Sequence, residues 1–307
     1  MIYKLLLISA KVGRMRKIES LSLLVCFILF FCGTSSFGKK IQVAVSLMPQ
    51  KYFVDKIGGD LVDTIVVIPP GADPHTYEPK AKQMIHLSDV KLYLSIGATF
   101  EQIWLKRISK INKEMMIIDM GAGIQKMSMD RHHEKLDIHH HEDEILDPHI
   151  WLSPPLVRIM AANIRDSLTN ISKNNSDTFK KNFLLFALKI NEVDLKILDI
   201  FKNATSKKYD FLVFHPTWGY FAREYGLNQI VIESEGKEPS PKELLHIVAS
   251  TKKLGLKTIF TQPQFSGKSA EIIAKELDAK IVLADPMAYN WDDNLYSVAK
   301  MLGLSLH

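Results

Sequence analysis

Two blocks of short apolar segments that alternate with amphipathic segments constrain the fold of this chain more than any other feature. Each block holds four apolar runs of strand length with helix-like segments between them. The runs of the first block are Ile41–Ser46, Thr64–Ile68, Leu92–Ile96 and Met116–Asp119, and those of the second are Phe211–Phe214, Gln229–Ile232, Thr258–Thr261 and Ile281–Leu283. Strands that alternate with helices form parallel sheets covered on both faces. The pattern therefore predicts an α/β fold of two lobes, each with a four-stranded parallel sheet flanked by helices.

A long helical segment without a predicted strand separates the two blocks. Between Asp177 and Lys202, apolar residues recur every three or four positions, and neither glycine nor proline occurs. At 1.5 Å per residue, such a helix is about 40 Å long. We expect one rigid linker helix within 173–204 that joins an N-terminal α/β lobe over 39–172 to a C-terminal α/β lobe over 205–307. Periodicity alone leaves open an ordinary surface helix of one domain.

The first 38 residues have the pattern of a secretory signal peptide. A basic patch precedes an apolar run over 21–32, and small residues follow. This run is too short for a bilayer-spanning helix, which needs about 20 apolar residues. We therefore expect residues 1–38 to be removed by cleavage after Gly38, which makes the mature protein periplasmic. Met15 is an alternative start of the chain.

Both cysteines, Cys26 and Cys32, lie in this leader. Cleavage after Gly38 would leave neither a disulfide nor a thiolate metal ligand in the mature chain. A lipid anchor at Cys32 is the alternative, but the large Phe31 stands where that signal has a small residue.

The charge of the chain gives no reason to expect a nucleic acid as partner. The formal net charge is +5, but the leader holds five basic side chains against one acidic side chain, so the remainder carries only +1. A nearly neutral mature chain lacks the basic surface by which proteins bind nucleic acid.

Three histidines and one aspartate stand in contexts that favour a site. His75 and His149 each follow an Asp-Pro pair, and the proline stiffens the loop that holds the imidazole. His215 ends a predicted strand of the second block, and Asp285 ends the last one. Sites in open α/β sheets form beyond the carboxyl ends of strands. Two candidates from each half are thus placed to converge between the lobes.

Three imidazoles and one carboxylate form a donor set for a divalent first-row metal. Imidazole suits Zn²⁺, whereas the carboxylate also admits Mn²⁺ or Fe²⁺. Any one histidine alone is more often a hydrogen-bonded structural residue, so the prediction depends on the joint pattern. The predicted metal ligands are His75, His149, His215 and Asp285.

Five motifs together resemble the metal-binding solute-binding proteins of bacterial ABC transporters, the zinc and manganese cluster. They are Asp-Pro-His-Thr-Tyr-Glu-Pro, Asp-Pro-His-Ile-Trp-Leu-Ser-Pro, Phe-His-Pro-Thr-Trp-Gly-Tyr-Phe-Ala-Arg-Glu-Tyr-Gly-Leu, Gln-Pro-Gln-Phe-Ser-Gly-Lys-Ser-Ala and Ala-Asp-Pro-Met, and they occur in the family's order over 40–305. The resemblance implies two lobes joined by one long helix, with a metal buried between them on His75, His149, His215 and Asp285. It also implies an ABC transporter permease as partner, and we expect a monomer.

Two further features bear on the metal. Family members with a carboxylate at the third ligand position resemble manganese binders, so His215 favours zinc, although Asp285 keeps Mn²⁺ or Fe²⁺ as alternatives. Residues 132–144 hold five of the eleven histidines among acidic residues. Zinc-type members carry a loop of this kind here, which implies auxiliary weak metal sites, whereas a solvated polar loop is the alternative.

The expected function is high-affinity capture of a divalent metal, zinc first, and its delivery to an inner-membrane ABC permease, without catalysis. A metallohydrolase is the rival class. Catalytic zinc keeps an open position for water and needs a general base nearby, whereas four protein ligands close the site. Surface adhesion, which some relatives resemble, is a third class that could coexist with transport.

Overall fold

The computed structural model describes residues 39–129, 146–202, 209–233, 240–265 and 267–306. The chain divides into a unit of residues 1–39 and a unit of residues 40–307. The predicted signal peptide, the Cys32 anchor and the His-rich segment over 132–144 all lie outside the described residues. Within the described residues, no helix is long and apolar enough to cross a membrane.

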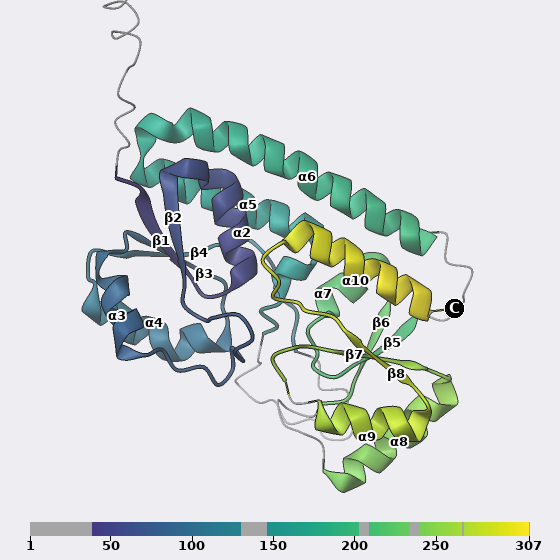
Figure 1. The fold of residues 1–307 in the computed structure, drawn as a ribbon. Helices are drawn as coiled ribbons and strands as arrows, with labels where there is room; N and C mark the ends of the chain where they lie inside the picture. Colours follow the sequence, from purple (N-terminus) through teal and green to yellow (C-terminus); the bar gives the residue numbers. More distant parts are fainter. Residues whose placement is uncertain (1–38, 130–145, 203–208, 234–239, 266, 307) are drawn as a thin grey trace, which may run out of the picture. The chain divides into compact units, whose positions relative to one another are not determined.

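The described part of residues 40–307 contains two four-stranded sheets in which all neighbouring strands run parallel (Figure 1). The first sheet has the order β2-β1-β3-β4 and the second has the order β6-β5-β7-β8, so the two sheets share one topology. Their strands are β1 (Ile41–Val45), β2 (Val62–Val66), β3 (Leu92–Ser95), β4 (Met116–Asp119), β5 (Asp210–Val213), β6 (Asn228–Val231), β7 (Thr258–Thr261) and β8 (Lys280–Leu283).

Helices connect the strands and cover the sheets. The α-helices are α2 (Met48–Gly58), α3 (Ala81–His86), α4 (Thr99–Ile111), α5 (Pro154–Ile171), α6 (Ser176–Lys202), α7 (Gly219–Tyr225), α8 (Pro241–Leu254), α9 (Lys268–Leu277) and α10 (Trp291–Ser305). Short 3₁₀ turns are η1 (Gly59–Leu61), η2 (Leu87–Asp89), η3 (Ile150–Leu152) and η4 (Lys173–Asn175).

The predicted fold class is confirmed, and the strand boundaries shift by at most two residues. The largest shift is in the second strand, which was predicted over Thr64–Ile68 and forms β2 over Val62–Val66. Pairing with β1 starts at Val62, directly after the η1 turn. The backbone N–H groups of Val67 and Ile68 still donate to carbonyls of the first strand segment, so hydrogen bonding continues past the end of β2.

Helix α6 runs alongside elements from both halves of the chain (Figure 1). It packs against α2 and α5 and also against α10. Its buried side chains are Phe179, Phe186, Ile190, Val193 and Ile197. They belong to one hydrophobic core that holds residues of both sheets, whereas a smaller core lies around β7, α8 and α9. The long helix is therefore part of the core of residues 40–307 as well as a connection.

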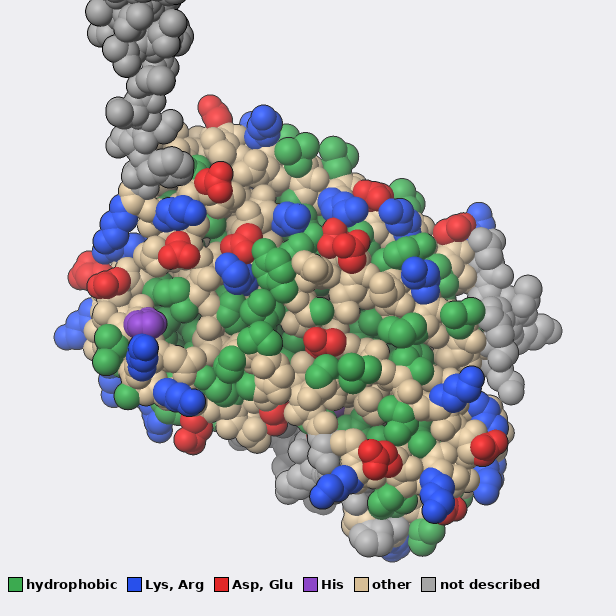
Figure 2. Space-filling model, in the orientation of Figure 1, with side chains coloured by type: hydrophobic (Ala, Val, Ile, Leu, Met, Phe, Trp, Pro, Cys, Tyr) green, Lys and Arg blue, Asp and Glu red, His purple; other side chains and the backbone are tan. Residues whose placement is uncertain are grey.

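Basic and acidic side chains are interspersed on the face of the molecule that Figure 2 shows. Neither sign of charge forms a continuous field over that face. This mixture agrees with the near-neutral charge that the sequence assigns to residues beyond the leader.

Candidate metal centre

The loop that follows β2 holds His75 by local hydrogen bonds. Asp73 Oδ1 accepts the backbone N–H of His75 at 2.9 Å, and Asp73 Oδ2 accepts the Thr76 hydroxyl at 2.9 Å. The backbone N–H groups of Thr76 and Tyr77 donate to the Asp73 carbonyl. Asp73 thus closes the turn that presents the partly buried imidazole, as expected of an aspartate before proline.

In the second Asp-Pro-His motif the aspartate again accepts the backbone N–H of the histidine, and this motif is more deeply buried. Asp147 Oδ1 accepts both the backbone N–H of His149 at 2.9 Å and its ring Nδ1–H at 2.6 Å. The exposed fraction of His149 is 5% and that of Asp147 is 3%. The carboxylate therefore fixes both the loop and the orientation of the ring.

The three predicted histidines converge. One ring nitrogen from each of His75, His149 and His215 lies within 4.8 Å of the other two. The Nε2 atoms of His75 and His215 are 3.3 Å apart. Two nitrogens that lie 2.0–2.1 Å from one zinc ion at the tetrahedral angle are about 3.3–3.4 Å apart. This pair is thus already at the spacing of two zinc ligands.

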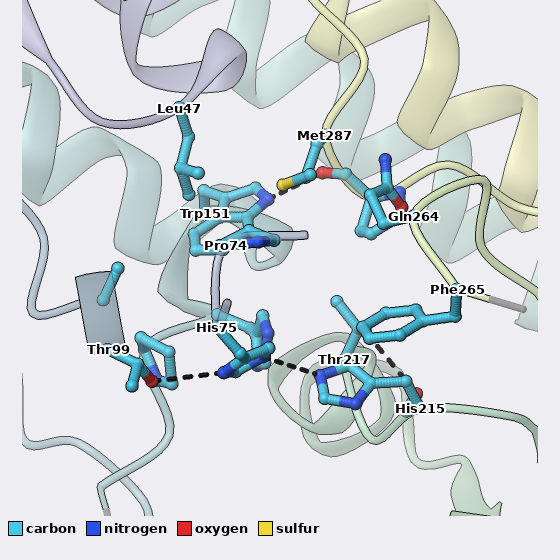
Figure 3. A pocket seen from close by; sticks show the side chains of 14 residues that line it. Leu47, Pro74, His75, Thr99, Trp151, His215, Thr217, Gln264, Phe265 and Met287 are labelled. Carbon is cyan, nitrogen blue, oxygen red and sulfur yellow. Dashed lines mark hydrogen bonds between the residues drawn. The ribbon is translucent and has the colours of Figure 1, made fainter. Parts of the chain in front are cut away.

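The histidines line a cavity of about 30 Å³, which has room for one ion or one to two water molecules. Most of the remaining wall is apolar or aromatic, as Figure 3 shows for Leu47, Trp151, Phe265 and Met287. The Phe265 ring stacks on His215 with a centroid distance of 4.5 Å. A wall of this kind excludes water and lowers the local dielectric constant, which strengthens metal–ligand attraction.

Glu233 supports His215, a contact that no motif in the sequence indicates. Its Oε2 accepts the ring Nδ1–H of His215 at 2.6 Å. His215 follows β5 and Glu233 follows β6, and these two strands are parallel neighbours. Glu233 stands directly after an apolar strand, as His215 does. Once the strand order is known to place these two strands side by side, that position in the sequence indicates that the two side chains can meet.

Thr99 supports His75 from the first turn of α4. Its Oγ1 lies 3.2 Å from His75 Nδ1. The segment before Thr99 is held by Glu101, whose carboxylate accepts the backbone N–H groups of Ile96 at 2.9 Å and Gly97 at 2.6 Å. Glu101 also accepts the hydroxyl of Ser46, and burial raises the pKa of its carboxyl group. This buried carboxylate therefore shapes the loop from which Thr99 reaches the centre.

The pKa of His75 is lowered to about 4 in the folded protein. Burial is the largest cause, followed by repulsion from the positive charges that His215 and His149 would carry. A neutral imidazole with a free lone pair is the form that binds a metal. The pocket therefore keeps His75 in a competent charge state at neutral pH.

Asp285, the predicted fourth ligand, is not part of the histidine group. Its Oδ1 accepts Gln264 Nε2 at 2.9 Å and the backbone N–H of Met287 at 2.9 Å. Strand β7 lies between β5 and β8, so the ends of the strands that carry His215 and Asp285 are separated by two strand spacings, about 10 Å. Asp285 instead lines a neighbouring cavity of about 240 Å³, which shares Leu47, Gln264 and Met287 with the histidine pocket.

The comparisons with known proteins decide the family. Residues 43–299 match the family described as zinc-uptake complex component A, periplasmic (ZnuA). The chain belongs to this family. The chain is also 30% identical, over 81% of its length, to the zinc-binding protein AdcA of Streptococcus pyogenes serotype M3. It spans about half the length of that relative, 50%.

Two other members of the ZnuA family match over most of their length. The high-affinity zinc uptake system protein ZnuA of Bacillus subtilis is 29% identical over 83% of this chain and 83% of its own. A crystal structure of ZnuA superposes with a TM-score of 0.81 and 39% identity, and the match covers 88% of this chain and all of that chain. The two-lobed fold with its long helix is thus the fold of a ZnuA structure.

Proposed function

We propose that this protein captures a divalent metal ion, zinc first, and delivers it to an ABC transporter permease. The observation that carries this proposal is the 3.3 Å separation of the Nε2 atoms of His75 and His215, with His149 in the same group. That separation suits tetrahedral zinc. The printed names of the AdcA and Bacillus subtilis ZnuA relatives, which refer to zinc binding and zinc uptake, support zinc as the ion.

The proposed ligands are His75, His149, His215 and Asp285. The three imidazoles stand within reach of one ion. Asp285 joins them by leaving Gln264 and the Met287 N–H and turning from the neighbouring cavity, a local movement of the loop after β8. Because an oxygen donor accommodates harder ions, manganese and iron stay the alternatives to zinc.

Binding without catalysis is proposed over metallohydrolase chemistry. Asp147 and Glu233, which lie next to the centre, accept hydrogen bonds from His149 and His215. A hydrolytic site needs a carboxylate directed at a metal-bound water. Asp285, if it ligates the ion, also removes the open position that such a water would occupy.

The proposed setting of the protein is the periplasm, after removal of residues 1–38, as a monomer that meets a membrane permease and no nucleic acid. Family membership supports the compartment and the class of partner. The interspersed charges of Figure 2 support the absence of a nucleic acid partner.

Residues 132–144 are proposed as auxiliary weak metal sites, although they lie outside the described residues. The chain enters and leaves that region through a short antiparallel neck, where Ser128 pairs with Leu146 and the Asp147 N–H donates to the Met127 carbonyl at 2.8 Å. Deletion of 132–144 should lower the total zinc bound and leave one tight site. Loss of the tight site on deletion would contradict this proposal.

A chelator-competition titration with Zn²⁺ tests the main site. The wild-type protein should bind one ion tightly, and His75→Ala, His149→Ala and His215→Ala should each weaken binding at least about 100-fold, because each removes a ligand. His246→Ala is the matched control, since His246 is exposed on α8. Wild-type affinity in two of the three variants would overturn the site.

A further inference from the structure

A second cavity adjoins the histidine pocket and is much larger, about 240 Å³ against about 30 Å³. Part of its wall is formed by residues 68–71, in the loop that leads from β2 to His75. Another part is formed by residues 287–289, in the loop that carries Asp285. The larger cavity is thus built from loops that also hold two of the proposed metal ligands.

The two volumes admit different forms of a metal ion. Small divalent ions in water hold six oxygen ligands in an octahedral shell. A water molecule occupies about 30 Å³ in the liquid, so six of them need about 180 Å³. The larger cavity has room for an ion with this whole shell, whereas the histidine pocket has room for the ion alone. An ion that passes from one to the other therefore has to lose its shell of water at the boundary.

The larger cavity leads from the surface towards the histidine pocket. Residues 69–71 in its wall are exposed, as is Tyr289, whereas Leu47 and Ile68 are buried. The exposed residues form its rim, and the buried ones lie at its inner end. The Tyr289 hydroxyl donates to Asp55 Oδ2 at 2.9 Å, which ties the rim to α2. The entrance therefore needs no rearrangement to admit an ion.

Leu47, Gln264 and Met287 line both cavities, and we call these three residues the partition. Figure 3 shows them around the histidine pocket. Asp285 Oδ1 holds two of them, since it accepts Gln264 Nε2 and the backbone N–H of Met287, both at 2.9 Å. Such hydrogen bonds are strong because the acceptor is charged, and they weaken when a cation shares that charge. Binding of a cation to Asp285 therefore loosens the partition.

Asp285 is the one acidic side chain among the described residues that line the two cavities. Its charge lies among largely apolar walls, which focus its field on an entering cation. We propose that the larger cavity is an entry vestibule, in which a hydrated divalent cation first meets Asp285 and then passes the partition to the histidines as it loses water. Asp285 is thus the collector of the ion as well as its proposed fourth ligand, which accounts for its position outside the histidine group.

This inference rests on the proposed metal-binding function, and stopped-flow mixing of the purified protein with Zn²⁺ tests it. Tryptophan fluorescence gives the association rate, since Trp151 lines the histidine pocket, and a chelator chase gives the dissociation rate. Ala288 lines the vestibule and not the histidine pocket. Ala288→Phe should therefore slow association and dissociation alike, each about tenfold, and leave the affinity unchanged, because a narrowed route alters the rates and not the bound state.

Two further variants accompany this experiment. Ala288→Val fills less of the vestibule and should give a smaller slowing of both rates. Ala249→Phe, at an exposed position of α8, is the control for an added aromatic ring. An unchanged association rate in Ala288→Phe, with zinc still tightly bound, would overturn the vestibule and leave the proposed function intact. Absence of tight zinc binding in the wild-type protein would overturn the function itself.

Asp285→Asn separates collection of the ion from ligation. This change removes the charge but keeps an oxygen that can accept from Gln264 and Met287. Loss of a ligand alone raises the dissociation rate, whereas loss of a collector lowers the association rate. We expect the association rate to fall at least about threefold. Asp293→Asn, exposed on α10, controls for the charge of the whole molecule, and an association rate that Asp285→Asn leaves unchanged would overturn the vestibule.

Discussion

The indole N–H of Trp291 donates a hydrogen bond of 2.7 Å to the backbone carbonyl of Trp151. Trp151 in turn donates its own indole N–H to the Pro286 carbonyl at 2.8 Å. These two buried bonds join the turn after His149 to the loop after Asp285 and to the start of α10. Opening the centre by a wide hinge would break both bonds in a dry environment, which is costly.

We therefore expect metal binding to change the structure locally. Trp291 also packs edge-on against Phe53 and Phe186, at centroid distances of 5.4 and 6.4 Å, so α10 and α6 share the core with the first half of the chain. Hydrogen–deuterium exchange with and without zinc should show protection around His215 and Asp285 and no change along α6. A change spread over all of α6 would contradict this expectation.

Asp285→Ala should keep a three-imidazole site of reduced affinity. If the carboxylate ligates the ion, its loss should weaken Mn²⁺ binding more than Zn²⁺ binding, because manganese is the harder ion and prefers oxygen. Competition titrations with both metals measure the two ratios, and Asp293→Ala, an exposed acidic residue of α10, controls for the lost charge. An equal loss for both ions, or no loss, would remove Asp285 from the ligands and leave a three-histidine site completed by water.

The convergence of the three histidines could be predicted from the sequence because they lie in stiff local motifs or directly after a strand. The Asp-Pro-His loops of His75 and His149 are defined by neighbouring residues, and His215 ends a strand whose apolar pattern is clear. Glu233 and Thr99 could not be predicted in the same way. Their contacts depend on which strands pair and on where α4 begins, and neither follows from local pattern.

The distance of Asp285 from the histidines also depends on strand order, which local sequence pattern does not give. The sequence places it correctly after the last strand of the second sheet. The strand order puts that strand at the edge, with β7 between it and β5. Position along the sequence indicates that a residue ends a strand, but the distance between two strand ends depends on the order of the strands in the sheet.

Glu101→Gln should destabilise the protein by about 2 kcal/mol. The carboxylate accepts the N–H groups of Ile96 and Gly97 and the Ser46 hydroxyl, so an amide N–H₂ in its place would either face backbone donors or force the Ser46 hydroxyl to reverse its hydrogen bond. Urea denaturation measures the free energy of unfolding, and Glu114→Gln, at an exposed position, is the control. Equal stability of the two variants would contradict the assigned role of the buried carboxylate.

Acid should destabilise the metal-free protein through His75. The pKa of this group is about 4 when folded against an ordinary 6.5. Between these values the unfolded chain binds more protons, so the free energy of unfolding rises with pH and falls on acidification. From pH 7.5 to pH 5, His75 should account for a loss of about 2 kcal/mol. Urea denaturation with a chelator present should show a smaller loss in His75→Ala, and an equal loss would contradict this expectation.

X-ray absorption at the zinc edge, on protein loaded with one equivalent of Zn²⁺, tests the central claim most directly, since it counts the ligands of the ion. The three converging histidines predict three imidazole nitrogens at about 2.0–2.1 Å, and Asp285 predicts one oxygen beside them. His215→Ala should reduce the imidazole count to two. A wild-type count below three, or a spectrum that His215→Ala leaves unchanged, would place the ion elsewhere and contradict the account.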